Sequence, residues 1–287
     1  MVTEFDVSIK IVTDSTSDIP IDLASSLGIT IVPGYVRFGN DTYRDGTDIS
    51  AEAFYQKLVN SPFHQITSEP TPDDFEKVYS DCSLEAEHII SIHASSKVSK
   101  ILKSAIAAKK RIKGPCHIEI IDSRSISIGL GLIVKNAARL SNSGDSIVSI
   151  LDQINGDLNN IRMLGVLSTM KYLIKGRRVI KISAALSHVL DIKPVLTFDN
   201  GEIIQDGIVH GDSPSRVIER LYKFVQTYAN VQDITIAHGN TSDLTEALIE
   251  RLGVIFPKEK IHLYHLGAAL GVHSGPGALI VALRQGN

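Results

Sequence analysis

The chain has 287 residues, and 29 Lys and Arg against 32 Asp and Glu give a formal net charge of −3. Apolar residues make up 43% and charged residues 21%, which is typical of a globular protein and excludes disordered, collagen-like and disulfide-rich classes. No apolar run reaches the roughly 18 residues that a membrane-spanning helix needs, and the start lacks a secretory pattern. We therefore expect a cytoplasmic protein in which Cys82 and Cys116 remain thiols.

Short β-branched runs alternate with longer helical patterns through the first half of the chain. Such alternation predicts a mostly parallel sheet with helices on both faces. A polar turn at 14–18 leads to a helix that Pro20 can open and Gly28 ends, and Asn40-Asp41 is expected to turn a hairpin. The strands are predicted at 9–13, 29–33, 89–93 and 118–121, and the further helices at 51–59, 73–79, 98–110 and 126–140.

Hairpin signals mix with helical patterns in the second half, where Asn200-Gly201 is the strongest turn signal and Pro194 suggests an edge strand. A helix at 144–155 is the expected crossover. Strands are predicted at 163–167, 192–198, 234–238, 261–266 and 278–283, and helices at 179–190, 215–228 and 244–252. The predicted fold class is α/β, with an N-terminal mostly parallel domain at 1–157 and a C-terminal mixed-sheet α+β domain at 158–287.

Most catalytic signatures are absent from the sequence. There is no GxSxG elbow and no GxxxxGK[ST] phosphate loop, and Gly129-Leu130-Gly131 lacks the third glycine of a dinucleotide fingerprint. His262 and His265 lie in a strand-like run, where alternation directs them to opposite faces rather than to one metal ion. We therefore expect no cofactor, no metal site and no catalytic residues.

Two hydroxyl-rich turns stand out, because ligands bind in open α/β sheets in the crevice beyond the strand ends. The stiff turn 67–72 contains two prolines, and its hydroxyls, Thr67 among them, either contact a ligand or cap the next helix. The turn 94–99 contains Ser95, Ser96 and Ser99. These serines either hold an anion at a helix N-terminus or cap that helix.

Two later segments add a cation and a histidine. Residues 175–178 form a basic turn in a stretch without acidic residues, and its arginines can clamp a carboxylate or phosphate or lie on a solvated face. Around His273, three glycines and a proline allow close backbone approach, although a simple turn histidine is the alternative. The small residues at 267–271 either leave room for a ligand or permit tight strand packing. Together these side chains suit an anionic head group better than acid–base chemistry.

Seven segments, in this order, resemble motifs of the DegV family, some of whose members are the fatty acid-binding subunits of bacterial fatty acid kinase. They are 11–20 with the DST turn, 67–70 (TSQP), 95–99 (SSKLSGT), 122–131 (DS…GLG), 176–182 (GGRI), 192–194 (IKP) and 273–277 (HTGPG).

The resemblance implies a two-domain α/β protein that buries a long-chain fatty acid near the domain junction. It implies a carboxylate held by Thr67 and by the turn with Ser95, Ser96 and Ser99, with Arg178 and His273 near it and Gly275 in the same loop as His273. In the kinase system a partner phosphorylates the bound acid with ATP, so this chain would present the substrate and carry the acyl phosphate. Any membrane contact would be transient.

Three segments depart from the family pattern. Lys100 and Ile101 stand where Gly and Thr are usual, Glu69 replaces Gln, and Arg177 replaces a second glycine. Glu69 would disfavour an anion unless it turns away or pairs, whereas Lys100 and Arg177 add positive charge that could favour a phosphate.

Two other functions are considered. The same turns could serve an enzyme that acts on a small phosphorylated or keto substrate with His273 as acid or base, although no partner base is recognisable nearby. The basic run at 97–113 could contact nucleic acid, but the chain is acidic overall and no aromatic residue interrupts the run. We therefore expect no nucleic acid partner, and a solvated face or a docking surface for the kinase subunit instead.

Overall fold

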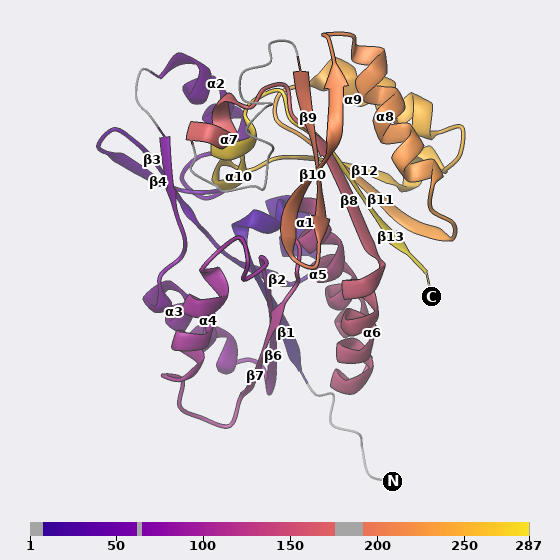
Figure 1. The fold of residues 1–287 in the computed structure, drawn as a ribbon. Coiled ribbons are helices and arrows are strands. Elements are labelled where there is room, and N and C mark those ends of the chain that lie inside the picture. Colours follow the sequence, from indigo (N-terminus) through magenta and orange to yellow (C-terminus); the bar gives the residue numbers. More distant parts are fainter. Residues whose placement is uncertain (1–7, 62–64, 176–191, 287) are drawn as a thin grey trace.

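The computed structural model describes residues 8–61, 65–175 and 192–286. Two large sheets dominate it, and Figure 1 shows the sheet from the first half of the chain below the sheet from the second half. The predicted helix at 179–190, together with Arg177 and Arg178, lies outside the described residues. The predicted fold class, with a parallel-sheet N-terminal domain and a mixed-sheet C-terminal domain, is confirmed.

The lower sheet is entirely parallel, with strand order β2-β1-β6-β7. It contains β1 (Ile9–Asp14), β2 (Ile29–Val32), β6 (His88–His93) and β7 (His117–Asp122). The helices around it are α1 (Ile21–Ser26), α3 (Pro72–Ser83), α4 (Ile101–Lys109), α5 (Ser127–Asn142) and α6 (Ile147–Asn160). In Figure 1, α3 and α4 lie on one side of this sheet and α5 and α6 on the other. Its central strands are buried on both faces, as a parallel sheet requires.

A small antiparallel sheet with strand order β4-β3-β5 is separate from the lower sheet and packs against the upper domain. It consists of β3 (Tyr35–Phe38), β4 (Asp41–Arg44) and β5 (Gln65–Ser68). Helix α2 (Ala51–Asn60) connects β4 to β5. Val36, Phe38 and Phe54 share a core with Leu266 and Val272 from the end of the chain. The hairpin between β3 and β4 is confirmed. Strand β5 is not predicted, and it places Thr67 opposite Val36 in a sheet rather than in a loop.

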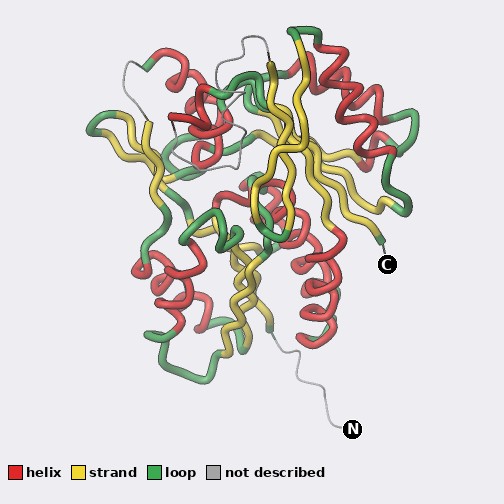
Figure 2. The backbone as a smooth tube through the Cα atoms, viewed as in Figure 1, coloured by secondary structure: helices red, strands yellow, loops and turns green. Residues whose placement is uncertain are grey.

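The upper sheet has strand order β10-β9-β8-β13-β11-β12, and only β11 and β12 run parallel. Its strands are β8 (Ile161–Val166), β9 (Ile192–Asp199), β10 (Glu202–His210), β11 (Val231–His238), β12 (Ile261–His265) and β13 (Leu279–Gln285). Helices α8 (Pro214–Gln226) and α9 (Ser242–Leu252) cover its outer face, as Figure 2 also shows. The other face is turned toward α5 and two short helices, α7 (Lys171–Lys175) and α10 (Ala268–Ser274).

The hairpin between β9 and β10 turns at Asn200-Gly201 as predicted, with φ of 47° and 83° at these two residues. The edge position suggested by Pro194 is wrong, because β9 lies between β10 and β8. The proline is tolerated there for two reasons. Pro194 lies beyond Val195, the last residue of β9 that pairs with β8. On its other side, the pairing of β9 with β10 is irregular between Gln205 and Ile208.

Residues 268–274 form helix α10 and not the turn that was expected around His273. The close contact of α10 with α2 explains one of its glycines, because a Cβ on Gly271 would lie 2.4 Å from a ring carbon of Phe54. His273 therefore projects from the last turn of a helix, and the small residues serve helix packing.

Helix α5 joins the two halves of the molecule. Gly131 lets α5 approach the 3₁₀ turn η1 (Ser15–Ser17), since a Cβ there would lie 2.6 Å from the carbonyl oxygen of Ser17. Helix α6 then leads directly into β8, which makes it the crossover. The proposed boundary between residues 157 and 158 falls within the last turn of α6 and stays an interpretation.

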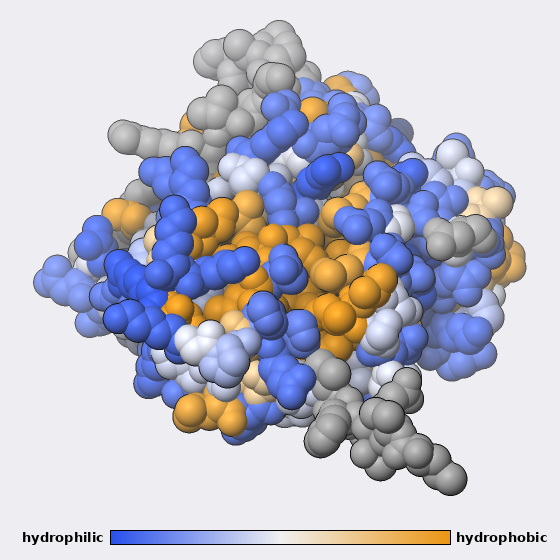
Figure 3. Space-filling view, turned by 90° about the horizontal axis from the view of Figure 1, so that it is seen from below, coloured by the Kyte–Doolittle hydropathy of each residue, from blue (hydrophilic) through white to orange (hydrophobic). Residues whose placement is uncertain are grey.

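The surface carries apolar side chains as well. Seen from below in Figure 3, hydrophobic residues gather at the centre of this face, and hydrophilic residues surround them. In the part of the chain that the structure describes, every helix is too short or too polar to span a lipid bilayer. Both Cys82 and Cys116 are free thiols.

Candidate functional site

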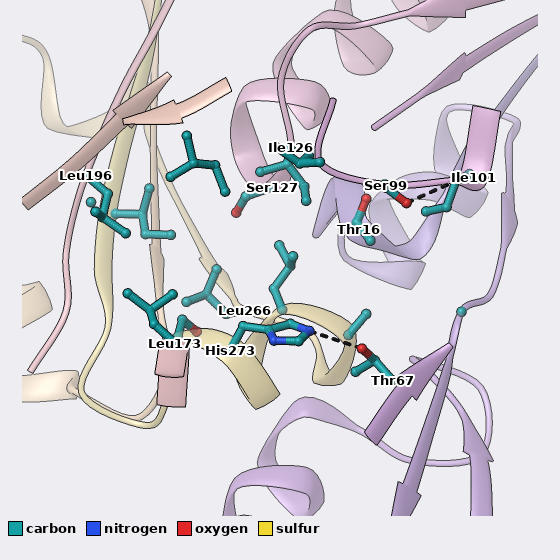
Figure 4. Close-up of a pocket in the computed structure, with 18 of the residues that line it drawn as sticks. Thr16, Thr67, Ser99, Ile101, Ile126, Ser127, Leu173, Leu196, Leu266 and His273 are labelled. Carbon is teal, nitrogen blue, oxygen red and sulfur yellow. Dashed lines mark hydrogen bonds between the residues drawn. The ribbon is translucent and has the colours of Figure 1, made fainter. Parts of the chain in front are cut away.

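A cavity lies where the carboxyl ends of the lower strands meet the inner face of the upper sheet. It contains about 1050 Å³ of space between atoms, part of it open to solvent. Figure 4 shows side chains from both halves of the chain pointing into it. Most of its walls are apolar, and they include Ile126, Leu167, Leu173, Leu196, Phe198 and Leu266. A cavity with this apolar lining suits a largely apolar ligand.

Polar side chains border the cavity at one end. Thr67, at the end of β5, is joined to His273 of α10 by a hydrogen bond of 3.0 Å between Oγ1 and Nε2. Ser99 and Thr16 border the same region, and in Figure 4 they lie close to each other and to Ile101. The hydroxyls of Thr16, Thr67 and Ser99 thus come together with one histidine, although Thr67 and His273 are 206 positions apart in the sequence.

Thr67 is not the cap of the following helix. Thr71 caps α3 instead: its side chain accepts a hydrogen bond from the backbone N–H of Asp74, and the Asp74 carboxylate accepts from the backbone N–H of Thr71. This reciprocal capping box satisfies the helix end locally. The Thr67 hydroxyl instead contacts His273, and both residues border the cavity.

Of the three serines in the 94–99 turn, Ser99 alone borders the cavity. Ser95 is buried and donates to the carbonyl oxygen of Gly201 at 2.7 Å, which ties this turn to the β9–β10 hairpin. Ser96 is exposed and donates to the carboxylate of Asp122. Helix α4 begins three residues later than predicted, so neither Ser95 nor Ser96 caps it, and Ser99 Oγ accepts from the N–H of Ile101 at 3.2 Å.

The other predicted site residues lie as follows. Gly275 ends α10 with φ of 75°, and a Cβ there would lie 2.2 Å from the ring of Tyr172, so its contact is with the protein. Arg178 is outside the described residues, so its place in the site stays a prediction. Glu69 borders the cavity next to Thr67.

Sequence reasoning missed Thr16 as a cavity residue, although it belongs to the DST turn. Asp14 holds Thr16 in place by accepting from its backbone N–H at 3.0 Å and from its hydroxyl. The other oxygen of Asp14 contacts His93 Nδ1 at 3.0 Å. The Nε2 atom of His93 is hydrogen-bonded to the hydroxyl of Ser91, which is hydrogen-bonded in turn to the hydroxyl of Tyr79. This fully buried network joins β1 to β6 and positions Thr16 at the cavity wall.

Two buried carboxylates, also missed, anchor the helix that carries His273. Asp18 accepts from the N–H of Gly267 at 2.8 Å, and Asp45 accepts from the N–H groups of Ala268 at 2.8 Å and Ala269 at 3.1 Å. These are the donors that a helix N-terminus leaves without intrahelical partners. Asp18 also accepts from the hydroxyl of Ser127 at 2.6 Å, which connects α5 to the same anchor.

Burial raises the pKa of both carboxyl groups. The pKa of Asp18 rises to about 8, because loss of solvent outweighs the hydrogen bonds from Ser127 and Gly267 that favour the anion. The pKa of Asp45 is raised for the same main reason. Asp18 is therefore largely protonated in the folded protein at neutral pH.

This pKa predicts how Asp18 affects stability. Between the ordinary pKa of 3.8 and about 8, the folded state binds a proton that the unfolded state does not. The contribution of Asp18 to the free energy of unfolding should therefore fall as pH rises, by up to about 1.4 kcal/mol per pH unit. Asp18→Asn stays neutral; its Oδ1 can still accept from the N–H of Gly267, and its Nδ2 can donate to the hydroxyl of Ser127. This variant should flatten the decline in urea unfolding measured from pH 5 to pH 8.

Asp22→Asn is the matched control, because Asp22 is an exposed residue in the first turn of α1. This variant should follow the pH profile of the unsubstituted protein. A profile for Asp18→Asn that is as steep as that of the control would contradict the prediction.

The described residues contain no group of three or more His, Cys, Asp or Glu side chains that could hold a metal ion. His262 and His265 lie on β12 as expected, and His265 is exposed.

The sequence model described as "Uncharacterised protein, DegV family" matches residues 8–285. A DegV domain-containing protein of Deinococcus radiodurans is 30% identical over 279 residues, which cover 96% of this chain and 98% of the relative.

Solved structures of similar fold also match nearly the whole chain. A DegV family protein from Thermus thermophilus, described by its fatty acid binding, has 30% identity and a TM-score of 0.87, with 97% of this chain and 100% of that chain covered. DegV of Bacillus subtilis, described as a fatty acid binding protein, has 25% identity and a TM-score of 0.85, with 98% and 100% covered.

Proposed function

This chain belongs to the DegV family, and we propose that it binds a long-chain fatty acid in the cavity between its two sheets. The observation that carries the proposal is a cavity with apolar walls and a cluster of Thr67, Ser99 and His273 at one end. The two solved relatives that bind fatty acids share this fold across nearly their whole length.

The apolar walls supply the main driving force for binding. Each methylene group that leaves water for an apolar environment contributes about 0.8 kcal/mol. A chain of a dozen or more methylenes therefore gains enough from burial to offset the cost of immobilising the ligand. This supports a ligand with a long hydrocarbon tail over a small phosphorylated or keto substrate, which would gain little from these walls.

The polar cluster fits a carboxylate. Neutral hydroxyl donors and one imidazole can orient a carboxylate by hydrogen bonds at the end of an otherwise apolar cavity. We propose that Thr67, Ser99 and His273 contact the carboxylate, that Thr16 borders it, and that Arg178 adds the guanidinium that the family pattern leads us to expect. Ser95 and Gly275 would shape the site through their protein contacts, and the position of Ser96 beside Asp122 argues against a direct role.

We further propose that the chain presents the bound acid to a kinase subunit, which transfers the γ-phosphoryl group of ATP to the carboxylate and releases ADP. The fatty acid-loaded chain, mixed with a fatty acid kinase subunit and ATP, should then yield an acyl phosphate that hydroxylamine traps as a hydroxamate. If fatty acid binds but no hydroxamate forms, the binding role stands and the partner role fails.

The fatty acid proposal is tested by extracting the purified protein with organic solvent and identifying the released lipid by mass spectrometry. We expect a fatty acid, and we expect added palmitate or oleate at 100-fold above its Kd to stabilise the delipidated protein by about 2.7 kcal/mol. Hexadecane, which lacks a head group, should stabilise it less. A protein without lipid that neither acid stabilises would overturn the proposal, and turnover of a small substrate that His273→Ala abolishes would favour an enzyme instead.

A further inference from the structure

One face of the upper sheet forms a wall of the cavity. Met163, Gly165 and Leu167 alternate along β8 and its end, and all three border the cavity. The residues between them, Leu164 and Val166, belong to the core on the opposite face under α8 and α9. Alternation along the strand thus directs positions 163, 165 and 167 toward the ligand space.

Gly165 is the position on this wall that lacks a side chain. It pairs with Leu196 of β9 on one side and with Ile280 of β13 on the other, and both neighbours border the cavity. Directly paired residues point to the same face of a sheet, so a side chain at 165 would stand between them. A Cβ would lie 3.3 Å from Cγ1 of Ile280, its nearest neighbour, so a methyl group needs only a small adjustment.

The gap at Gly165 lies away from the polar cluster. In Figure 4, Leu196 is at one side of the cavity, while Thr67 and Ser99 are at the opposite side. Because Gly165 is paired with Leu196, it shares that distant part of the cavity. A ligand whose carboxylate contacts Thr67 would reach Gly165 with the far part of its tail.

We propose that Gly165 determines the longest acyl chain that the cavity accepts, by leaving open the space beside Leu196 and Ile280. This inference rests on the proposed function and names the specificity of the same site. A side chain at 165 fills the space that the last methylenes of a long tail need, and it leaves the carboxylate contacts unchanged. Each methylene excluded from the apolar cavity lowers affinity about four-fold.

The test compares the affinities of myristate, palmitate and stearate for the delipidated full-length protein, measured by displacement of a fluorescent fatty acid. In Gly165→Val, the added side chain should exclude about two methylenes, so the stearate-to-myristate affinity ratio should fall about fifteen-fold. Gly165→Ala should lower the same ratio about four-fold or less. It keeps the test valid if the valine variant does not fold.

Val166→Ile is the matched control, since it enlarges the next residue of β8 on the face turned away from the cavity. Its chain-length preference should equal that of the unsubstituted protein. If the unsubstituted protein binds none of the three acids, the proposed function itself fails. If it binds them and both Gly165 variants keep its preference, or lose all three acids equally, Gly165 does not set chain length and this inference is overturned.

Discussion

Replacing Asp233 by alanine is expected to lower the free energy of unfolding by about 3–5 kcal/mol. Asp233 on β11 accepts a hydrogen bond from Lys135 Nζ of α5 at 3.1 Å and from Arg284 Nη2 of β13 at 2.7 Å. Lys135 is 2% exposed and Asp233 is 8% exposed, so the pair joins the two halves of the molecule out of contact with bulk water. Removing the carboxylate would leave the ammonium of Lys135 buried without its counter-charge.

The pKa shifts of the pair agree with this account. Burial by itself would raise the pKa of Asp233, but Lys135 and Arg284 outweigh it and lower the pKa. Burial lowers the pKa of Lys135, against the attraction of Asp233. The carboxylate is thus needed to keep a buried cation charged. For this reason its removal should cost far more than the loss of an exposed ion pair.

Urea unfolding of Asp233→Ala, followed by circular dichroism, measures the effect. Glu85→Ala is the control, because it removes an exposed ion pair with Lys10 at 2.8 Å and should change stability by less than about 1 kcal/mol. The double variant Lys135→Met with Asp233→Leu should recover part of the loss, since it replaces both charges by apolar groups. A loss for Asp233→Ala no larger than that of the control would contradict the buried-pair interpretation.

Thr67→Val is expected to weaken fatty acid binding about 10- to 100-fold, which corresponds to the loss of one hydrogen bond to a charged group. Valine keeps the β-branched shape that suits β5 but removes the hydroxyl that contacts His273 and faces the cavity. The loss should be nearly equal for myristate and stearate, since all fatty acids share the same head group. This distinguishes it from the length-dependent loss expected at Gly165.

Displacement of a fluorescent fatty acid measures both affinities, and Thr42→Val is the matched control. Thr42 lies on β4 of the same small sheet, but its side chain is exposed. The methyl ester of palmitic acid, which lacks the carboxylate, should bind the Thr67→Val variant and the unsubstituted protein with more similar affinities. An unchanged affinity for the free acid, or a loss that grows with chain length, would rule out a head-group role for Thr67.

Several features of the fold follow from residues close together in the sequence. Asn200-Gly201 forms its hairpin turn because both residues tolerate positive φ, and Ser50 caps α2 because its hydroxyl reaches the N–H of Ala53, three residues on. Alternating β-branched runs and helical patterns were sufficient for the fold class. The ordered motifs from the DST turn to the HTGPG-like loop were sufficient for the family.

The tertiary structure alone decided which polar residues border the cavity. Ser95 contacts Gly201, which is 106 positions away, and Ser96 contacts Asp122, which is 26 positions away, so Ser99 is left at the cavity. His273 lies on a helix because Asp18 and Asp45, more than 220 positions earlier, accept hydrogen bonds at its N-terminus. Short-range patterns encode turns, caps and periodicity, whereas a side chain's partner depends on which distant segment packs beside it. The sequence therefore determined the helices and strands and supplied the hydroxyl side chains. Long-range packing decided which of these hydroxyl-bearing residues border the cavity.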